Sequence, residues 1–337
     1  MYGLGANALD ASAVSKVFVA KGRPSDNPLI VHVSDWAMME RVADPAFLRA
    51  HDATLRLLAA RFWPGALTVL MQRNVALPEN VTAGELRVGV RVPDNDTALR
   101  LIAESDCPLA APSANRSGRP SPTSAAHVLD DLNGRIAAVV DGGASRVGVE
   151  STVIDAFARP PLILRPGGVT LEQLRTVLPD IELYDAAVHG SAHRDKPATP
   201  GLKYRHYAPN APVTLVEPSR CSDVAAALTS LVRAALAAAP AASRVGLAYV
   251  GNAPADNAAA NLFANEPRVV LMALGATPEL VAQNLYSALR LFDDARVDTI
   301  AMQGVEEVGA GVAVLNRMRK AASANAANEL QPSLSFH

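Results

Sequence analysis

The hydrophobic pattern of this chain changes character part-way along, and that change constrains the fold more than any other feature. Up to about residue 168, short β-like runs alternate with helical stretches such as 46–62. The β-like runs are 29–33, 67–70, 88–92 and 137–140. Such an alternation predicts a mixed α/β domain.

A polar segment over 184–210 then interrupts the pattern, because His, Ser, Lys, Pro and Gly replace the apolar periodicity. This composition predicts a linker with little tendency to pack. Beyond it come three apolar runs typical of strands buried on both faces, with helical stretches between and after them. The runs are 213–216, 245–250 and 269–272, and the helical stretches are 225–238 and 280–294.

In the second of these helices Leu285, Ala288, Leu289 and Phe292 fall on one face, which we expect to cover a sheet. The chain is therefore predicted to be α/β, with a twisted mixed-sheet domain followed by a smaller Rossmann-like parallel-sheet domain. The expected division is a first domain over 1–183, a linker or lid over 184–211, a C-terminal domain over 212–325 and a disordered tail over 326–337.

Composition excludes several classes of protein. The net charge of −2 argues against a chain-wide grip on nucleic acid, although a local basic face at Lys203, Arg205 and His206 stays open. Cys107 and Cys221 are the two cysteines and show no metal-ligand spacing, so we expect no protein-bound metal, no disulfide framework and a reducing cytoplasm. No leader and no apolar run of bilayer length is apparent, which predicts a chain without membrane contact.

A pair of cations and a polar residue precede the first long β-like run. Lys21 and Arg23 are two residues apart, so on an extended segment both would point to the same side and suit a polyphosphate. For an isolated pair, an exposed basic turn is the commoner explanation. Asn27 leads into the run that carries His32, which the pattern alone equally allows to be a core histidine bonded to a backbone carbonyl.

Further polar residues stand where other β-like runs end or begin. Ser113 and Asn115 follow the short apolar run 107–110, and ligand sites gather at strand ends in α/β folds. The turn-rich stretch 117–123 predicts a loop that caps a helix near 125–132, and a helix N-terminus is itself an anion site. Ser151 begins a strand after a glycine-containing approach, and Arg165 ends the next one. Together these clusters predict a dispersed anion site.

Eight short motifs follow one another along the first part of the chain: Tyr2-Gly3-Leu4-Gly5, Lys21-Gly22-Arg23-Pro24, Asn27-Pro28-Leu29, Trp63-Pro64-Gly65, Arg91-Val92-Pro93, Ser113-Ala114-Asn115, Ser117-Gly118-Arg119-Pro120-Ser121 and Leu164-Arg165-Pro166-Gly167. In this order they resemble the YrdC-type threonylcarbamoyl-AMP synthases. The segment Pro200-Gly201-Leu202-Lys203-Tyr204-Arg205-His206-Tyr207-Ala208-Pro209 and the C-terminal α/β region resemble the two-domain branch of that family. The resemblance covers nearly the whole chain.

The resemblance implies an enzyme that joins L-threonine, bicarbonate or carbon dioxide, and ATP into threonylcarbamoyl-AMP and pyrophosphate, with Mg²⁺ accompanying the ATP. Other proteins would then transfer the threonylcarbamoyl group to an adenosine of tRNA, and a weak contact with RNA is possible. By position, Lys21 and Arg23 match the catalytic cations. The positions matched to ATP contacts are Arg23, Asn27, Ser113, Asn115, Ser121, Arg165 and Tyr207. The positions matched to the threonine pocket are His32, Arg91, Ala111 and Ser151.

Two features depart from the family pattern. A helix, a strand and a Pro-Thr-Glu-Thr-type segment normally precede the stretch at Tyr2, so we expect a shortened or misassigned start. Arg87 stands where the family commonly has a threonine facing the nucleotide. Two alternatives therefore remain open: a non-catalytic protein that binds double-stranded RNA or a nucleotide through the same cations, and an inactive truncated homologue.

Overall fold

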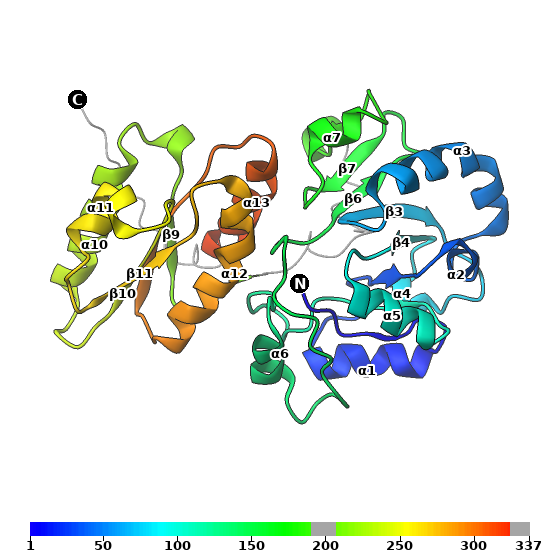
Figure 1. Ribbon diagram of the computed structural model, residues 1–337, viewed down its shortest axis with the longest axis horizontal. Helices are drawn as coiled ribbons and strands as arrows, with labels where there is room; N and C mark the ends of the chain where they lie inside the picture. The colour runs from blue at the N-terminus through cyan, green and yellow to red at the C-terminus, as the bar shows by residue number, and fades with distance from the viewer. Residues whose placement is uncertain (190–206, 324–337) are drawn as a thin grey trace.

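The computed structural model describes residues 1–189 and 207–323, and within them it shows two separate β-sheets (Figure 1). The first sheet has eight strands in the order β1-β5-β2-β4-β3-β6-β7-β8, and its neighbouring pairs are parallel in some places and antiparallel in others. Its strands are β1 (Ala6–Asn7), β2 (Ile30–His32), β3 (Leu67–Gln72), β4 (Arg87–Arg91), β5 (Leu109–Ala110), β6 (Thr152–Asp155), β7 (Leu162–Arg165) and β8 (Glu182–Leu183). The predicted mixed sheet is confirmed.

Helices of the first domain pack around this sheet, and its main core is built from apolar residues such as Val14, Leu55, Val69 and Val90. The helices are α1 (Ala11–Lys21), α2 (Trp36–Glu40), α3 (Pro45–Phe62), α4 (Glu79–Thr82), α5 (Asp96–Glu104), α6 (Ala125–Leu132), α7 (Leu171–Arg175) and α8 (Ala186–His189). The long helix predicted over 46–62 is α3, which begins after the N-cap Asp44 with Pro45 in its first turn.

The second sheet has the order β11-β10-β12-β9, and every pair in it is parallel. Its strands are β9 (Val213–Val216), β10 (Val245–Tyr249), β11 (Val269–Ala273) and β12 (Thr299–Gln303). The accompanying helices are α10 (Val224–Ala238), α11 (Ala258–Leu262), α12 (Pro278–Asp294) and α13 (Ala310–Ser323), with short 3₁₀ turns at Pro218–Arg220 and Pro254–Asp256. The Rossmann-like parallel domain is therefore confirmed, although β12 and α13 were not anticipated.

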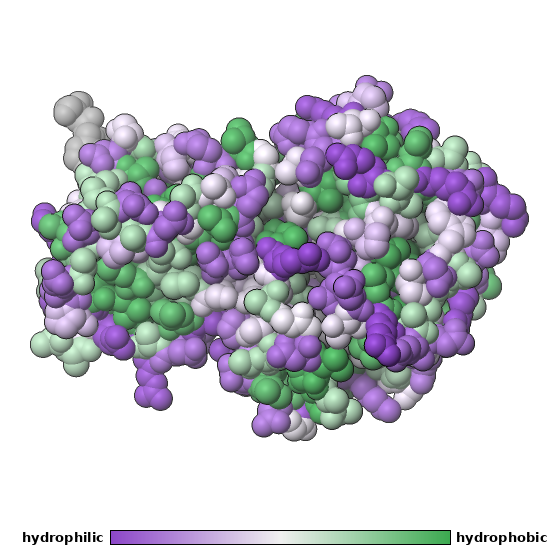
Figure 2. All heavy atoms as spheres, viewed as in Figure 1, coloured by the Kyte–Doolittle hydropathy of each residue, from purple (hydrophilic) through white to green (hydrophobic). Residues whose placement is uncertain are grey.

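The helices of the second domain lie on both faces of its sheet. α10 and α11 share one apolar core with the sheet, and α12 and α13 share another on the opposite face. The predicted stripe of Leu285, Ala288, Leu289 and Phe292 is fully buried in the second of these cores. Figure 1 shows that α12 and α13 are the helices turned toward the first domain, and Figure 2 shows the two domains meeting along a seam.

One expected strand is not formed, and several other expectations fall outside the described residues. Residues 137–140 form no strand but run over the surface, with Val139 packing against the small cluster on α6 and Val140 exposed. Most of the predicted linker, including 200–206, and the predicted tail lie outside the described residues. Among the described helices, none is both long and apolar enough to cross a membrane.

Candidate active site

A cavity of about 350 Å³ lies in the first domain beside the seam, and most of the residues singled out in the sequence line it. The singled-out residues in the lining are Lys21, Arg23, His32, Arg91, Ala111, Ser113, Asn115, Ser121, Ser151, Arg165 and Tyr207. They come from segments far apart in the chain, as the dispersed-site hypothesis required. Asn27 is buried but is not part of the lining.

Lys21 is the last residue of α1, which begins at the N-cap Asp10 and ends at Gly22 in the left-handed conformation (φ 60°). The extended segment assumed for Lys21 and Arg23 is therefore wrong, because a helix end and a glycine turn place these two side chains. The Lys21 ammonium donates to the carbonyl oxygens of Ser113 and Asn115, the latter at 2.5 Å. It thus fastens the Ser113–Asn115 segment to α1. Burial, and after it the charge of Arg23, lower the pKa of Lys21 to about 7.

Arg23 and Arg165 bring two guanidinium groups to the same cavity. Arg23 donates to the carbonyl oxygens of Asn27 at 3.2 Å and Pro28 at 3.0 Å, so Asn27 holds Arg23 through its backbone. Arg165, at the end of β7, donates to the Ser151 carbonyl at 2.9 Å and to its Oγ at 3.2 Å. Burial, and after it the charge of Arg165, lower the pKa of Arg23 to about 10, which leaves Arg23 charged at neutral pH.

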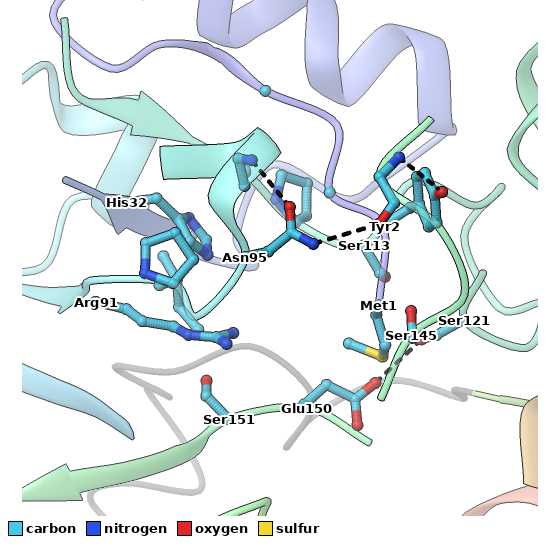
Figure 3. Close-up of a pocket in the computed structure, with 18 of the residues that line it drawn as sticks. Met1, Tyr2, His32, Arg91, Asn95, Ser113, Ser121, Ser145, Glu150 and Ser151 are labelled. Atoms are coloured by element: carbon cyan, nitrogen blue, oxygen red, sulfur yellow. Dashed lines mark hydrogen bonds between the residues drawn. The ribbon is translucent and has the colours of Figure 1, made fainter. Parts of the chain in front are cut away.

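Arg91 and His32 lie side by side because β2 and β4 pair in parallel with these two residues in register. Nε of Arg91 donates to the Gly65 carbonyl at 2.7 Å. Within residues 1–189 and 207–323 the two terminal nitrogens of Arg91 make no hydrogen bond with the protein. Figure 3 shows this guanidinium pointing into the cavity above Ser151. Burial, and after it the charge of Arg91, lower the pKa of His32 to about 3, so its ring is neutral. In the part of the chain that the structure describes, Nδ1 of His32 has no partner.

On the opposite side of the cavity in Figure 3, Ser121 meets the buried carboxylate of Glu150, to which the sequence analysis assigned no role. Ser121 Oγ donates to Glu150 at 3.0 Å, and Glu150 also faces Tyr286 and Arg317 from the second domain. Burial by itself raises the pKa of Glu150, but the charges of Arg317 and Arg165 hold it at about 2. A role for Glu150 could not be assigned from the sequence, because its partners Tyr286 and Arg317 are remote in the chain.

Charge in the cavity is strongly positive although the chain as a whole carries −2. Six of its lining residues are cations: Lys21, Arg23, Arg91, Arg119, Arg146 and Arg165. The two acidic lining residues, Asp94 and Glu150, pair with Arg146 and Arg317. Arg87 pairs with Asp155 and is not in the lining, which fits the doubt about a nucleotide contact there. The arrangement suits a polyanion beside a carboxylate.

Comparison with known proteins agrees with this geometry. Residues 1–167 match the Sua5/YciO/YrdC family, described as telomere recombination, and residues 169–323 match the Sua5 C-terminal domain, described as threonylcarbamoyl-AMP synthase, C-terminal domain. A threonylcarbamoyl-AMP synthase of Pyrococcus abyssi is 44% identical over 321 residues, which are 95% of this chain and 87% of that protein. The chain belongs to the Sua5 family.

Other Sua5 relatives extend the likeness over both domains. A threonylcarbamoyl-AMP synthase of Bacillus subtilis is 43% identical over 325 residues, covering 96% of this chain and 87% of the relative. The crystal structure of P. abyssi Sua5 complexed with L-threonine superposes with a TM-score of 0.82 at 42% identity, over 96% of this chain and 88% of that one. The family resemblance drawn from the motifs is confirmed, and the chain is an enzyme of the nucleotidyltransferase type.

Proposed function

We propose that this chain is an L-threonylcarbamoyladenylate synthase, which makes threonylcarbamoyl-AMP and pyrophosphate from L-threonine, bicarbonate or carbon dioxide, and ATP. The observation that carries the proposal is the meeting of Lys21, Arg23 and Arg165 with Arg91 in one cavity. The similarity to proteins named for this activity, along 95% of the chain, supports the same reaction.

On the nucleotide side, Arg23 and Arg165 neutralise phosphate charge, and Ser113, Asn115 and Ser121 offer hydroxyl and amide groups beside them. Lys21 acts in two ways, because its ammonium holds the Ser113–Asn115 segment and adds positive charge near the phosphates. Tyr207 lines the same cavity with its ring buried, where it can cover the nucleotide.

On the amino-acid side, Arg91 receives the threonine carboxylate through the fork of its terminal nitrogens. Neutral His32 stands next to it with Nδ1 available as a hydrogen-bond partner. Ala111 and Ser151 complete this part of the lining, and the Ser151 Oγ is fixed by Thr68 at 2.7 Å and by Arg165.

The reaction needs positioning and charge neutralisation more than a dedicated base. The threonine amine adds to carbon dioxide and loses a proton, which gives a carbamate. A carbamate oxygen then attacks the α-phosphorus, a new P–O bond forms, and pyrophosphate leaves with the electrons of the broken P–O bond. The guanidinium groups stabilise the charge that develops on the phosphoryl oxygens.

Magnesium would enter with the ATP. Both carboxylates of the lining are already paired, and in the described ranges no group of three or more acidic, His or Cys side chains is gathered to hold a metal. A Mg²⁺ ion held mainly by the phosphates fits such a site, since Mg²⁺ often takes few protein ligands. When bound, it would add charge neutralisation at the phosphates.

The product would serve other proteins that transfer the threonylcarbamoyl group to a tRNA adenosine, in the reducing cytoplasm that two free cysteines fit. RNA binding through the same cations is less favoured. Lys21 and Arg165 are 3% and 4% exposed, so a duplex backbone could not reach them without opening the cavity.

Pyrophosphate release from ATP tests the proposal. We expect release that requires both L-threonine and bicarbonate, and that falls strongly in Arg165→Ala. Release that ignores threonine would overturn the proposed substrate. Absence of both release and threonine binding would favour the inactive homologue instead.

A further inference from the structure

Glu150 joins the cavity to the second domain. It lines the cavity and is 7% exposed, and both of its carboxylate oxygens are engaged. One oxygen accepts from Ser121 at 3.0 Å and from the Tyr286 hydroxyl at 3.1 Å, and the other accepts from Tyr286 at 3.0 Å and from Nε of Arg317 at 2.9 Å. Ser121, on the nucleotide side of the cavity, therefore shares its hydrogen-bond acceptor Glu150 with Tyr286 of α12 and Arg317 of α13.

Arg317 also contacts the residue that follows Arg165 in the chain. Its side chain is fully buried, and Nη1 donates to the Pro166 carbonyl at 2.7 Å, one residue after Arg165. Its guanidinium also lies 5.9 Å from the ring centre of Tyr207, and that ring is 5.2 Å from the ring of Tyr286. Arg317 and Tyr286 thus contact Glu150, Arg317 also contacts Pro166, and both lie against Tyr207, while Ser121 is reached through Glu150.

The backbone around Glu150 is fitted closely to α12. A Cβ placed on Gly148 would lie 2.1 Å from the Ala282 carbonyl oxygen, and the φ of Gly148 is +73°, so glycine is required there on two counts. A second buried ion pair crosses the same seam, between Arg290 of α12 and Asp131 of α6 at 2.7 Å. The domains are therefore joined by specific buried contacts rather than by a loose apolar face.

We propose that Tyr286 and Arg317 are positioning residues for nucleotide binding, supplied by the C-terminal domain and acting through Glu150 on Ser121 and through Pro166 on Arg165. This inference rests on the proposed function. It gives the second domain a role in the reaction: its helices form the outer support of the nucleotide half of the cavity. Removing one of these contacts loosens Ser121 or Arg165 without removing a group that touches ATP.

A pair of adjacent residues on α12 provides the test. Tyr286→Phe removes a single hydroxyl from the Glu150 cluster. Ser287→Ala removes a hydroxyl that also crosses the seam, to Thr123 at 2.8 Å, but Thr123 is not part of the cavity lining. Both variants keep nearly the full side-chain volume, so we expect both to fold.

The affinity of the full chain for a non-hydrolysable ATP analogue is measured by calorimetry, together with amide hydrogen exchange of residues 117–121 in the free protein, a range that leaves out Thr123. We expect Tyr286→Phe to weaken nucleotide binding by about tenfold, as loss of a hydrogen bond to a charged group suggests, and to speed exchange in 117–121. Ser287→Ala should change nucleotide affinity by less than about twofold.

Equal effects of the two substitutions, or unchanged nucleotide affinity and exchange in Tyr286→Phe, would overturn the proposal. If the unsubstituted chain binds no nucleotide, the proposed function fails. The exchange of 117–121 in Tyr286→Phe against Ser287→Ala then still decides whether the second domain positions Ser121.

Discussion

At the scale of single residues, Arg91 combines a half-buried position at the end of β4, a fixed Nε contact with Gly65 and terminal nitrogens directed into the cavity. We predict that Arg91→Lys raises the KM for threonine by about tenfold and leaves the KM for ATP nearly unchanged, because an ammonium lacks the fork that fixes a carboxylate. Steady-state kinetics with each substrate varied in turn measure both constants.

Arg146→Lys is the matched control for Arg91→Lys. Arg146 also lines the cavity, but it is exposed and pairs with Asp94, so its substitution should leave both constants close to those of the unsubstituted chain. A threonine KM that is the same in Arg91→Lys and in the unsubstituted chain would remove Arg91 from the threonine site.

The lowered pKa of Lys21, about 7, gives a prediction for pH dependence. Phosphate binding favours the charged ammonium, so nucleotide binding must restore the proton once the pH exceeds this value. The affinity for the ATP analogue should therefore fall as pH rises from 7 to 9, and calorimetry at several pH values measures it. Lys21→Arg keeps its charge and should show a much flatter profile. Identical profiles for the two proteins would contradict this role.

At the scale of elements, the turn that ends α1 decides where Lys21 and Arg23 lie. Gly22 has φ 60°, and open space surrounds the position of a Cβ, so the cost of a side chain there is conformational rather than steric. We predict that Gly22→Ala lowers the stability of the first domain by about 1 kcal/mol. Gly22→Asn should cost less, since Asn tolerates the left-handed region.

Trp36 and Trp63 are the two tryptophans and both lie in the first domain, so their fluorescence during urea unfolding reports on that domain. If Gly22→Ala unfolds with the same urea midpoint as the unsubstituted chain, the turn does not need glycine.

Much of this element pattern could be predicted because it depends on local periodicity. The stripe on α12 and the strands β9, β10 and β11 follow from apolar spacing alone. The run 137–140 was misjudged, because four apolar residues fit a strand locally while no neighbouring strand pairs with them in the described sheets. The role of Glu150 and its contacts with Tyr286 and Arg317 could not be predicted, because these partners lie 136 and 167 positions away from it in the chain.

At the scale of the whole molecule, the seam between the domains depends on buried charge. Arg317→Met would leave Glu150 buried without its ion-pair partner, and we predict a loss of stability on the order of 3 kcal/mol. Arg319→Met, two residues along α13, breaks pairs in which Arg319 and Glu307 are partly exposed, and the buried Glu217 keeps Arg220 at 3.8 Å, so this substitution should cost less than Arg317→Met. Calorimetric melting of both variants compares them, and equal losses would contradict the special role of the Glu150 pair.

The cationic cavity implies that ATP and threonine react side by side in this chain. A double-label experiment tests this: the chain is supplied with ATP labelled at the α-phosphate, carbon-labelled bicarbonate and L-threonine, and the product is analysed. We expect one compound carrying both labels in equal amounts, formed by the unsubstituted chain and greatly reduced in Arg165→Ala. Labelled AMP without labelled carbon, or no labelled adenylate at all, would contradict it.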